Sequence, residues 1–198
     1  IAPWSISTSV VGTGAAASSF INVVDCAATQ LNVSVERLDF NMGNSSLLRV
    51  VTSSGKVLGK LDFSLDSTKA TINAPEVLAT ILVGVAAETV DVSVATTTID
   101  LDTHSSFFAL LPGIPALEVL RLDLTNSNIQ AVADFNARFI VFYSGVQKSA
   151  DIFIADTTAS QRSTTNNPVK TDVFIALLAT KFDGSLNVNV QRSQLKME

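Results

Sequence analysis

Alternation of apolar and polar residues with a period of two is the feature of this sequence that most restricts its fold. It is clear at Leu61, Phe63 and Leu65, which are separated by Asp62 and Ser64. Successive side chains of a β-strand point to opposite faces, so this alternation predicts strands with one buried face. Further examples are Leu31/Val33/Val35, Val90/Val92/Val94, Val119 with Leu122 and Leu124, Phe139/Val141/Tyr143, Val173/Ile175/Leu177 and Leu186/Val188/Val190.

These short strands, with Gly, Asn and Pro between them, predict an all-β fold. We expect a single antiparallel jelly-roll β-sandwich with one or two short helices in connecting loops. We identify no internal repeat and no linker that divides the 198 residues into separate domains. The expected organisation is an uncharged N-terminal arm over residues 1–20, lying over neighbouring subunits, followed by one jelly-roll domain over residues 21–198.

Three segments depart from the alternation. Asn44–Gly55 has apolar residues at helical spacing between possible caps, which predicts a short amphipathic helix between two strands. A second helix could start at Asn73, with Glu76 at capping-box spacing, although Thr80–Val83 favours a strand soon afterwards. Asp156–Thr171 is rich in Ser, Thr, Asn and Asp, which predicts a long polar surface loop.

Composition limits the partners that the chain can have. Hydrophobic residues make up 47% and charged residues 16%, an apolar balance that suggests burial against other subunits. The net charge is −5 and the basic residues are scattered, so any contact with nucleic acid would be weak and shared among copies. The apolar run Val77–Ala87 is too short to span a bilayer as a helix, and Ile1–Ser5 does not resemble a signal peptide. The chain lacks an initiator Met, and we expect it to be a piece cut from a longer protein.

No group of residues predicts a catalytic site. His104 is the only histidine, and Asp100, Asp102, Ser105 and Ser106 lie beside it. Adjacent residues of an extended chain point to opposite faces, whereas nucleophile, base and acid are assembled from distant positions. We therefore interpret His104 as a solvated loop residue and expect no enzyme activity to depend on it.

The remaining candidate residues also have structural interpretations. Cys26 lies among apolar residues and is expected to be a buried structural thiol. Gly12–Gly14 lacks the further glycines of a dinucleotide-binding loop, and Asp62 with Asp66 is expected to mark the exposed face of a strand and its adjoining turn. The sequence thus predicts no catalytic, cofactor-binding or metal-binding residues and no cofactor.

Two regions resemble the capsid proteins of plant picorna-like viruses, the secovirid family. The resemblance is to a comovirus small coat subunit or a cheravirus small coat protein. The similar pattern is a short helix with a Leu-Leu-Arg stretch, then a glycine and a long strand, with a later strand pair as a weaker match. The segments that carry it are Ser45–Gly55, Lys56–Leu65, Ala79–Val85, Leu117–Leu124 and Ala137–Tyr143.

The resemblance implies a structural subunit of an icosahedral capsid that encloses single-stranded RNA. Its partners would be other copies of itself, sister coat proteins and the genomic RNA, with no membrane. It would be located in the virion, and in the host cytoplasm during assembly. The alternative is a β-sandwich binding module or adhesin domain of a cell surface. One Trp and one Tyr provide few stacking platforms for a sugar-binding module of that kind.

Overall fold

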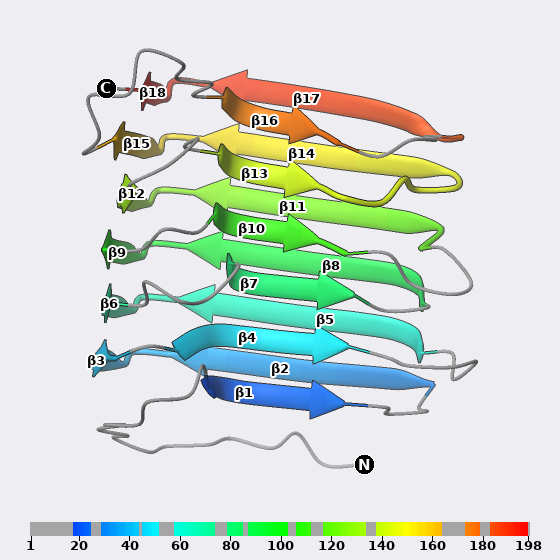
Figure 1. The fold of residues 1–198 in the computed structure, drawn as a ribbon, viewed down its shortest axis with the longest axis horizontal. Coiled ribbons are helices and arrows are strands. Elements are labelled where there is room, and N and C mark those ends of the chain that lie inside the picture. Colours follow the sequence, from blue (N-terminus) through cyan, green and yellow to red (C-terminus); the bar gives the residue numbers. More distant parts are fainter. Residues whose placement is uncertain are drawn as a thin grey trace.

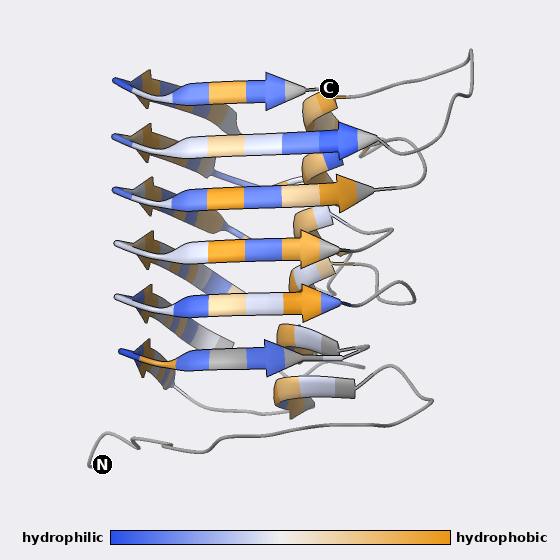
Figure 2. Ribbon diagram, turned by 90° about the vertical axis from the view of Figure 1, so that its left-hand side faces the viewer, coloured by the Kyte–Doolittle hydropathy of each residue, from blue (hydrophilic) through white to orange (hydrophobic). Residues whose placement is uncertain are grey.

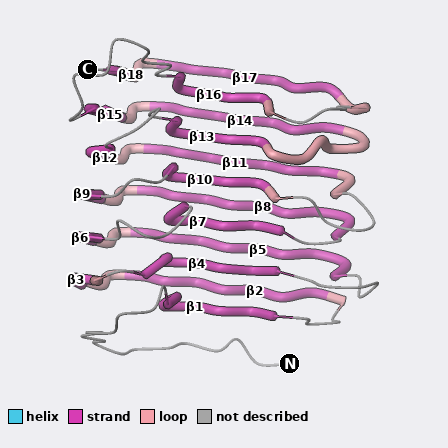
Figure 3. The backbone as a smooth tube through the Cα atoms, viewed as in Figure 1, coloured by secondary structure: helices cyan, strands magenta, loops and turns pink. Residues whose placement is uncertain are grey.

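The computed structural model describes residues 18–24, 29–43, 45–51, 58–73, 79–84, 87–102, 106–111, 117–133, 138–163, 173–178 and 183–197. The described elements are strands that stack into three parallel sheets around a common axis, which is a β-solenoid (Figure 1). Figure 3 shows the strands joined by loops and turns, with no helix among the described residues. The all-β part of the predicted fold is confirmed.

Each sheet contains six strands, and the chain passes through the three sheets in turn. We call three successive strands, one from each sheet, a coil. Sheet A contains β1 (Ser18–Val24), β4 (Ser45–Val51), β7 (Ala79–Gly84), β10 (Ser106–Leu110), β13 (Arg138–Phe142) and β16 (Val173–Leu177). Sheet B contains β2 (Gln30–Glu36), β5 (Leu58–Asp66), β8 (Ala87–Ala95), β11 (Val119–Thr125), β14 (Ser149–Ala155) and β17 (Ser185–Gln191). Sheet C contains β3 (Asp39–Met42), β6 (Lys69–Asn73), β9 (Thr98–Asp102), β12 (Asn128–Ala133), β15 (Thr158–Ser163) and β18 (Gln194–Met197).

The predicted antiparallel jelly-roll sandwich is wrong. Neighbouring strands pair in parallel in all three sheets, for example β5 with β8 and β8 with β11. Parallel neighbours need a crossover connection of about a dozen residues or more. Here the crossover is the rest of the coil, because the chain passes through the other two sheets before it returns. Period-two alternation identifies half-buried strands but does not say in which direction their neighbours run.

The core lies inside the solenoid and runs along its axis. Alternate residues of each strand point inward, so one residue of each coil joins a ladder that continues through all six coils. In Figure 2 the strands of sheet C, nearest the viewer, alternate between hydrophilic and hydrophobic residues. One inward ladder of sheet B consists of Val33, Phe63, Val92, Leu122, Ile152 and Val188.

Aromatic stacking reinforces the core beside sheet A. The rings of Phe107 and Phe139 are stacked with centroids 5.0 Å apart, and those of Phe139 and Phe174 with centroids 4.6 Å apart. These residues come from three successive coils, so the stacking runs along the solenoid axis. Aromatic pairs of this kind add about 0.5–1.5 kcal/mol beyond the area that they bury.

A conserved geometry joins sheet B to sheet C in every coil. The residue after each sheet B strand has a positive φ, between 44° and 54°, at Arg37, Ser67, Thr96, Asn126, Asp156 and Arg192. In five coils a Ser or Thr follows, and its hydroxyl donates to the carbonyl two residues back, as Thr97 Oγ1 does to Ala95 O at 2.7 Å. In the central and later turns this hydroxyl also accepts a hydrogen bond from the backbone N–H of the preceding coil. For example, Thr97 N donates to Ser127 Oγ at 3.2 Å.

The turns also reveal a repeat that the sequence interpretation missed. Their positive-φ residues are 30, 29, 30, 30 and 36 positions apart. Aligned on them, Phe63–Thr68, Val92–Thr97, Leu122–Ser127 and Ile152–Thr157 share one pattern of apolar, outer, apolar, outer, turn and hydroxyl residues. The repeat conserves residue class rather than identity, and the expectation of no internal repeat is therefore wrong.

The helix predicted over Asn44–Gly55 is a strand where the structure describes it. Ser45–Val51 forms β4, and Leu48 pairs in register with Ile21 on one side and Ile81 on the other. Leu47, Leu48 and Val50 are all buried, so apolar residues at adjacent positions reflect cover on both faces of this strand. Asn73 ends β6. The second helix was expected to continue over residues 74–78, which lie outside the described residues.

Two further predictions concern segments that are described only in part. The loop predicted over Asp156–Thr171 contains strand β15, Thr158–Ser163, in which Ala159 and Gln161 are buried. That half of the loop prediction is wrong, and residues 164–171 lie outside the described residues. Of the predicted arm over residues 1–20, the last three residues belong to β1 and the others are not described.

Candidate functional site: the outer face of sheet B

The outer face of sheet B carries ordered rows of polar side chains. Each strand of the sheet buries its alternate apolar residues, which leaves the intervening polar residues in rows that cross the strands. The row that runs through the middle of the face consists of Asn32, Asp62, Asp91, Arg121, Asp151 and Asn187. The adjacent row consists of Ser34, Ser64, Ser93, Asp123, Phe153 and Asn189.

Lys60 and Arg121 hold the carboxylates of the first half of this face. Lys60 Nζ lies 2.7 Å from Asp62 Oδ1 and 2.9 Å from Asp91 Oδ2. Arg121 Nη1 lies 3.5 Å from Asp91 Oδ1, so Asp91 bridges two cations from neighbouring coils. Partial burial alone would raise the pKa of Asp62, but hydrogen bonds from Lys60 and Gln30 outweigh it and lower that pKa. Asp62 and Asp91 are thus each paired with a cation of this half of the face.

The second half is held differently, through amides and hydroxyls. Asn187 Nδ2 donates to Asp151 Oδ1 at 2.7 Å, and Ser149 Oγ donates to Asp151 Oδ2 at 3.1 Å. Asp123 lies between the two halves. Its pKa is raised, first by partial burial and then by the charge of Asp91, while Arg121 opposes the shift. Asp123 is thus the carboxylate of this face that most readily accepts a proton or a cationic partner.

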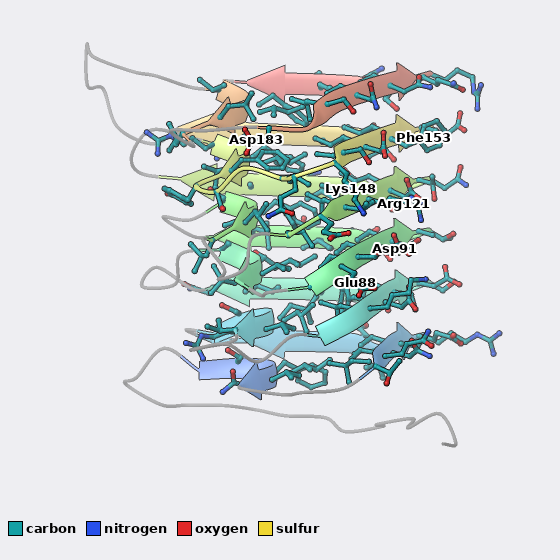
Figure 4. All side chains as sticks on the ribbon, turned by 90° about the vertical axis from the view of Figure 1, so that its right-hand side faces the viewer. Glu88, Asp91, Arg121, Lys148, Phe153 and Asp183 are labelled. Atoms are coloured by element: carbon teal, nitrogen blue, oxygen red, sulfur yellow. The ribbon has the colours of Figure 1, made fainter. Side chains whose placement is uncertain are left out.

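Phe153 is next to Asp123 in the same row and is the only aromatic residue at an outer position of sheet B. Its side chain is half-buried. Figure 4 shows Phe153, Arg121 and Asp91 on successive strands of sheet B, with Glu88, Lys148 and Asp183 at the corner where the strands begin. At that corner Lys148 Nζ pairs with Glu118 Oε2 at 2.6 Å. An aromatic face beside a carboxylate can hold a sugar ring or a cationic group.

Only some of the residues weighed at the sequence level are described. His104, Cys26 and Gly12–Gly14 lie outside the described residues. Asp62 and Asp66 both lie on β5, on the outer face of sheet B, whereas Asp100 belongs to β9 in sheet C. Ser106 is buried in β10. The outer rows were missed because their residues are about a coil apart in sequence, and only the unrecognised repeat would have aligned them.

Metal binding has no support in the described residues, where no three His, Cys, Asp or Glu side chains are grouped to hold an ion. Nor do the described residues include a helix with the length and apolar character needed to cross a membrane. No family model, curated protein or solved structure matches the chain.

Proposed function

We propose that the chain is a structural, non-catalytic segment of a stiff solenoid shaft. The observation that carries the proposal is the constant register of the three sheets: each pair of neighbouring strands keeps one offset along its length. Stacked coils of this kind form one continuous core, and each coil is supported by its neighbours along the axis. Such a stack resists bending because a bend would stretch the hydrogen-bond ladder on its convex side.

The distribution of ionisable groups supports this role. The buried polar side chains of the described residues are hydroxyls and one amide, and no described Asp, Glu, Lys or Arg is buried. Enzymes commonly bury ionisable groups in a cleft to shift their pKa values toward the working pH. The groups described here face solvent instead, in rows that neutralise one another across the coils.

Hydrogen exchange of the purified chain tests the shaft. We expect the backbone amides of β8 and β11 to exchange only through global unfolding, because both edges of each strand are paired. Strand β17, which pairs on one side among the described residues, should exchange faster. Local opening of β8 or β11 at a small fraction of the global free energy would contradict a stiff shaft.

A second candidate function is binding of a neutral or cationic polysaccharide at Phe153. The supporting observation is the register pairing of this aromatic residue with Asp123, whose pKa is raised first by partial burial and then by the charge of Asp91. Chitosan oligosaccharide, dextran and dextran sulfate separate the possibilities by titration calorimetry. We expect chitosan to bind, Phe153→Ser to weaken binding about tenfold, and Ser64→Ala in the same row to leave it unchanged. Equal binding by Phe153→Ser would contradict this function.

The viral coat hypothesis has lost two of the features that motivated it. Ser45–Val51 is a strand rather than a helix, and the strands that follow belong to a parallel solenoid rather than a jelly roll. A capsid role, a virion location and RNA as a partner stay predictions, and electron microscopy of native material tests them by the presence of icosahedral shells.

A further inference from the structure

The last coil exposes apolar residues at positions that are buried in every central coil. Val188 and Val190 on β17 are 45% and 43% exposed, and Leu177 on β16 is 49% exposed. Their ladder neighbours one coil below, Ile152 and Ile154, are buried. Only the position along the axis differs, and among the described residues no further coil covers these side chains. In Figure 1, β16, β17 and β18 form the upper end of the described stack.

The first coil is open in the same way at the other end. Strands β1 and β2 pair only with β4 and β5 among the described residues. A hollow of about 400 Å³ is lined by residues 20–23 and 31–35. Among the described residues, the lining belongs to β1 and β2 of the first coil, which places the hollow at this end of the stack. Ile21, Leu31 and Val33 are accordingly only partly buried.

The two open ends match each other in register. If the ladders are continued past the last coil, each strand of that coil meets the first-coil strand of the same sheet, residue by residue. The matched inward positions are all apolar: Leu186 with Leu31, Val188 with Val33, Val190 with Val35, Ile175 with Ile21 and Leu177 with Val23. The matched outer positions of sheet B are polar, including Asn187 with Asn32, a pair suited to an amide ladder.

We propose that the last coil of one copy stacks on the first coil of a second copy, so that the solenoid continues from chain to chain. The contact joins two different surfaces and therefore does not close; it produces open, linear filaments. Unpaired strand edges and uncovered inward side chains of both ends are satisfied together. The inference deepens the proposed structural role, because it names a second copy as the partner of the shaft.

One feature of the ends opposes the contact and provides a way to adjust it. Arg192 and Arg37 occupy equivalent turn positions and would become neighbours across the junction. Arg192 already makes two hydrogen bonds to Asp156, at 2.6 Å and 2.7 Å. An acid at position 37 would place Arg192 between two carboxylates. We therefore expect Arg37→Asp to tighten association about tenfold, and added salt to reduce that gain.

Sedimentation velocity of the full chain over a range of concentrations tests the stacking. We expect linear oligomers that grow with concentration. Val188→Lys places a charge at an inward position that is exposed in the monomer, so the coil should fold but no longer accept a partner. Asn189→Lys adds the same charge at the neighbouring outer position and should leave the oligomers largely intact. Equal effects of the two variants would overturn the proposal.

A mixing experiment tests the polarity of the contact. Val188→Lys blocks one end and Val33→Lys blocks the other, with Leu31→Lys as a substitute if the Val33 variant does not fold by circular dichroism. Neither variant alone should associate, and a mixture should form one-to-one dimers that grow no further. A chain that stays monomeric at all concentrations, or dimers insensitive to both variants, would overturn the stacking. Slow exchange of β8 and β11 in that monomer would leave the structural role standing.

Discussion

Strands β11 and β17 have the same place in their coils but very different surroundings. Leu122 on β11 and Val188 on β17 belong to one inward ladder, yet the first is 0% and the second 45% exposed. Each coil contributes apolar inward side chains, and the coils above and below bury them. In a solenoid, therefore, burial depends on axial position as much as on the residue itself.

The comparison extends to the outer face. In the central coils this face is acidic, with Asp91, Asp123 and Asp151 on three successive strands, whereas β17 presents the amides Asn187 and Asn189. The last coil thus combines an uncovered apolar interior with an uncharged outer row. Such an end carries little charge repulsion toward another coil, in contrast to edge strands that carry lysines to prevent association.

The largest difference between the two regions should appear when the inward ladder is shortened. Leu122→Ala should lower the free energy of unfolding by about 2–5 kcal/mol, because it removes a fully buried side chain and leaves a cavity. Val188→Ala should cost below about 1 kcal/mol, because half of the side chain is already in water. Urea denaturation measures both variants. Similar losses would mean that the last coil is covered in solution.

The hydroxyl ladder offers a second contrast. Ser127 Oγ accepts from Thr97 N at 3.2 Å and donates to Thr125 O at 2.8 Å in a buried turn. Ser127→Ala leaves that amide without a partner and should cost about 1–3 kcal/mol. Ser193→Ala, at the equivalent place in the last coil, should cost about 0.5–1 kcal/mol because water can reach Thr157 N. A larger loss for Ser193→Ala would contradict an open end.

Replacing a buried amide next to the last coil should raise the free energy of unfolding rather than lower it. Gln161 is 1% exposed, and neither its Oε1 nor its Nε2 has a hydrogen-bond partner among the described residues. The equivalent position two coils below is the apolar Leu101. Gln161→Leu should stabilise the fold by about 1–3 kcal/mol by removing unsatisfied polar atoms. Gln130→Leu, at an exposed outer position, should change stability by less than about 0.5 kcal/mol. Thermal denaturation distinguishes the two, and destabilisation by Gln161→Leu would indicate a partner for the amide.

The sequence was sufficient to predict strands but not their arrangement. Alternation correctly placed Leu61, Phe63 and Leu65, as well as Val90, Val92 and Val94, on the inward faces of strands. It could not give the direction of pairing, because one strand with a buried face looks the same in a sandwich and in a solenoid. The repeat carries that information, and it is visible only when residue classes around the turns are aligned.

The candidate site was harder to predict for the same reason. Asp62, Asp91 and Asp151 are remote in sequence and fall into one row only through the coil length. At β4, the apolar residues at adjacent positions fit the spacing of a helix, but a short strand covered on both faces has the same pattern. The local pattern therefore predicts which residues face inward. Which strands lie side by side, and which faces they bury, depends on contacts between distant segments.

The smallest expected effect concerns Asp123, the crowded acid of the central face. Its folded-state pKa is raised by burial and by Asp91, so the stability it contributes is present below its unfolded pKa and is lost as pH rises through its folded pKa. Asp123→Asn should therefore stabilise the fold at neutral pH, by less than about 1 kcal/mol because the group reaches solvent, and should have no effect near about pH 3. Asn189→Asp adds an acid at the uncrowded end of the same row and should cost less than Asp123→Asn gains. Denaturation at the two pH values checks both variants, and a pH-independent effect of Asp123→Asn would show that packing rather than charge is responsible.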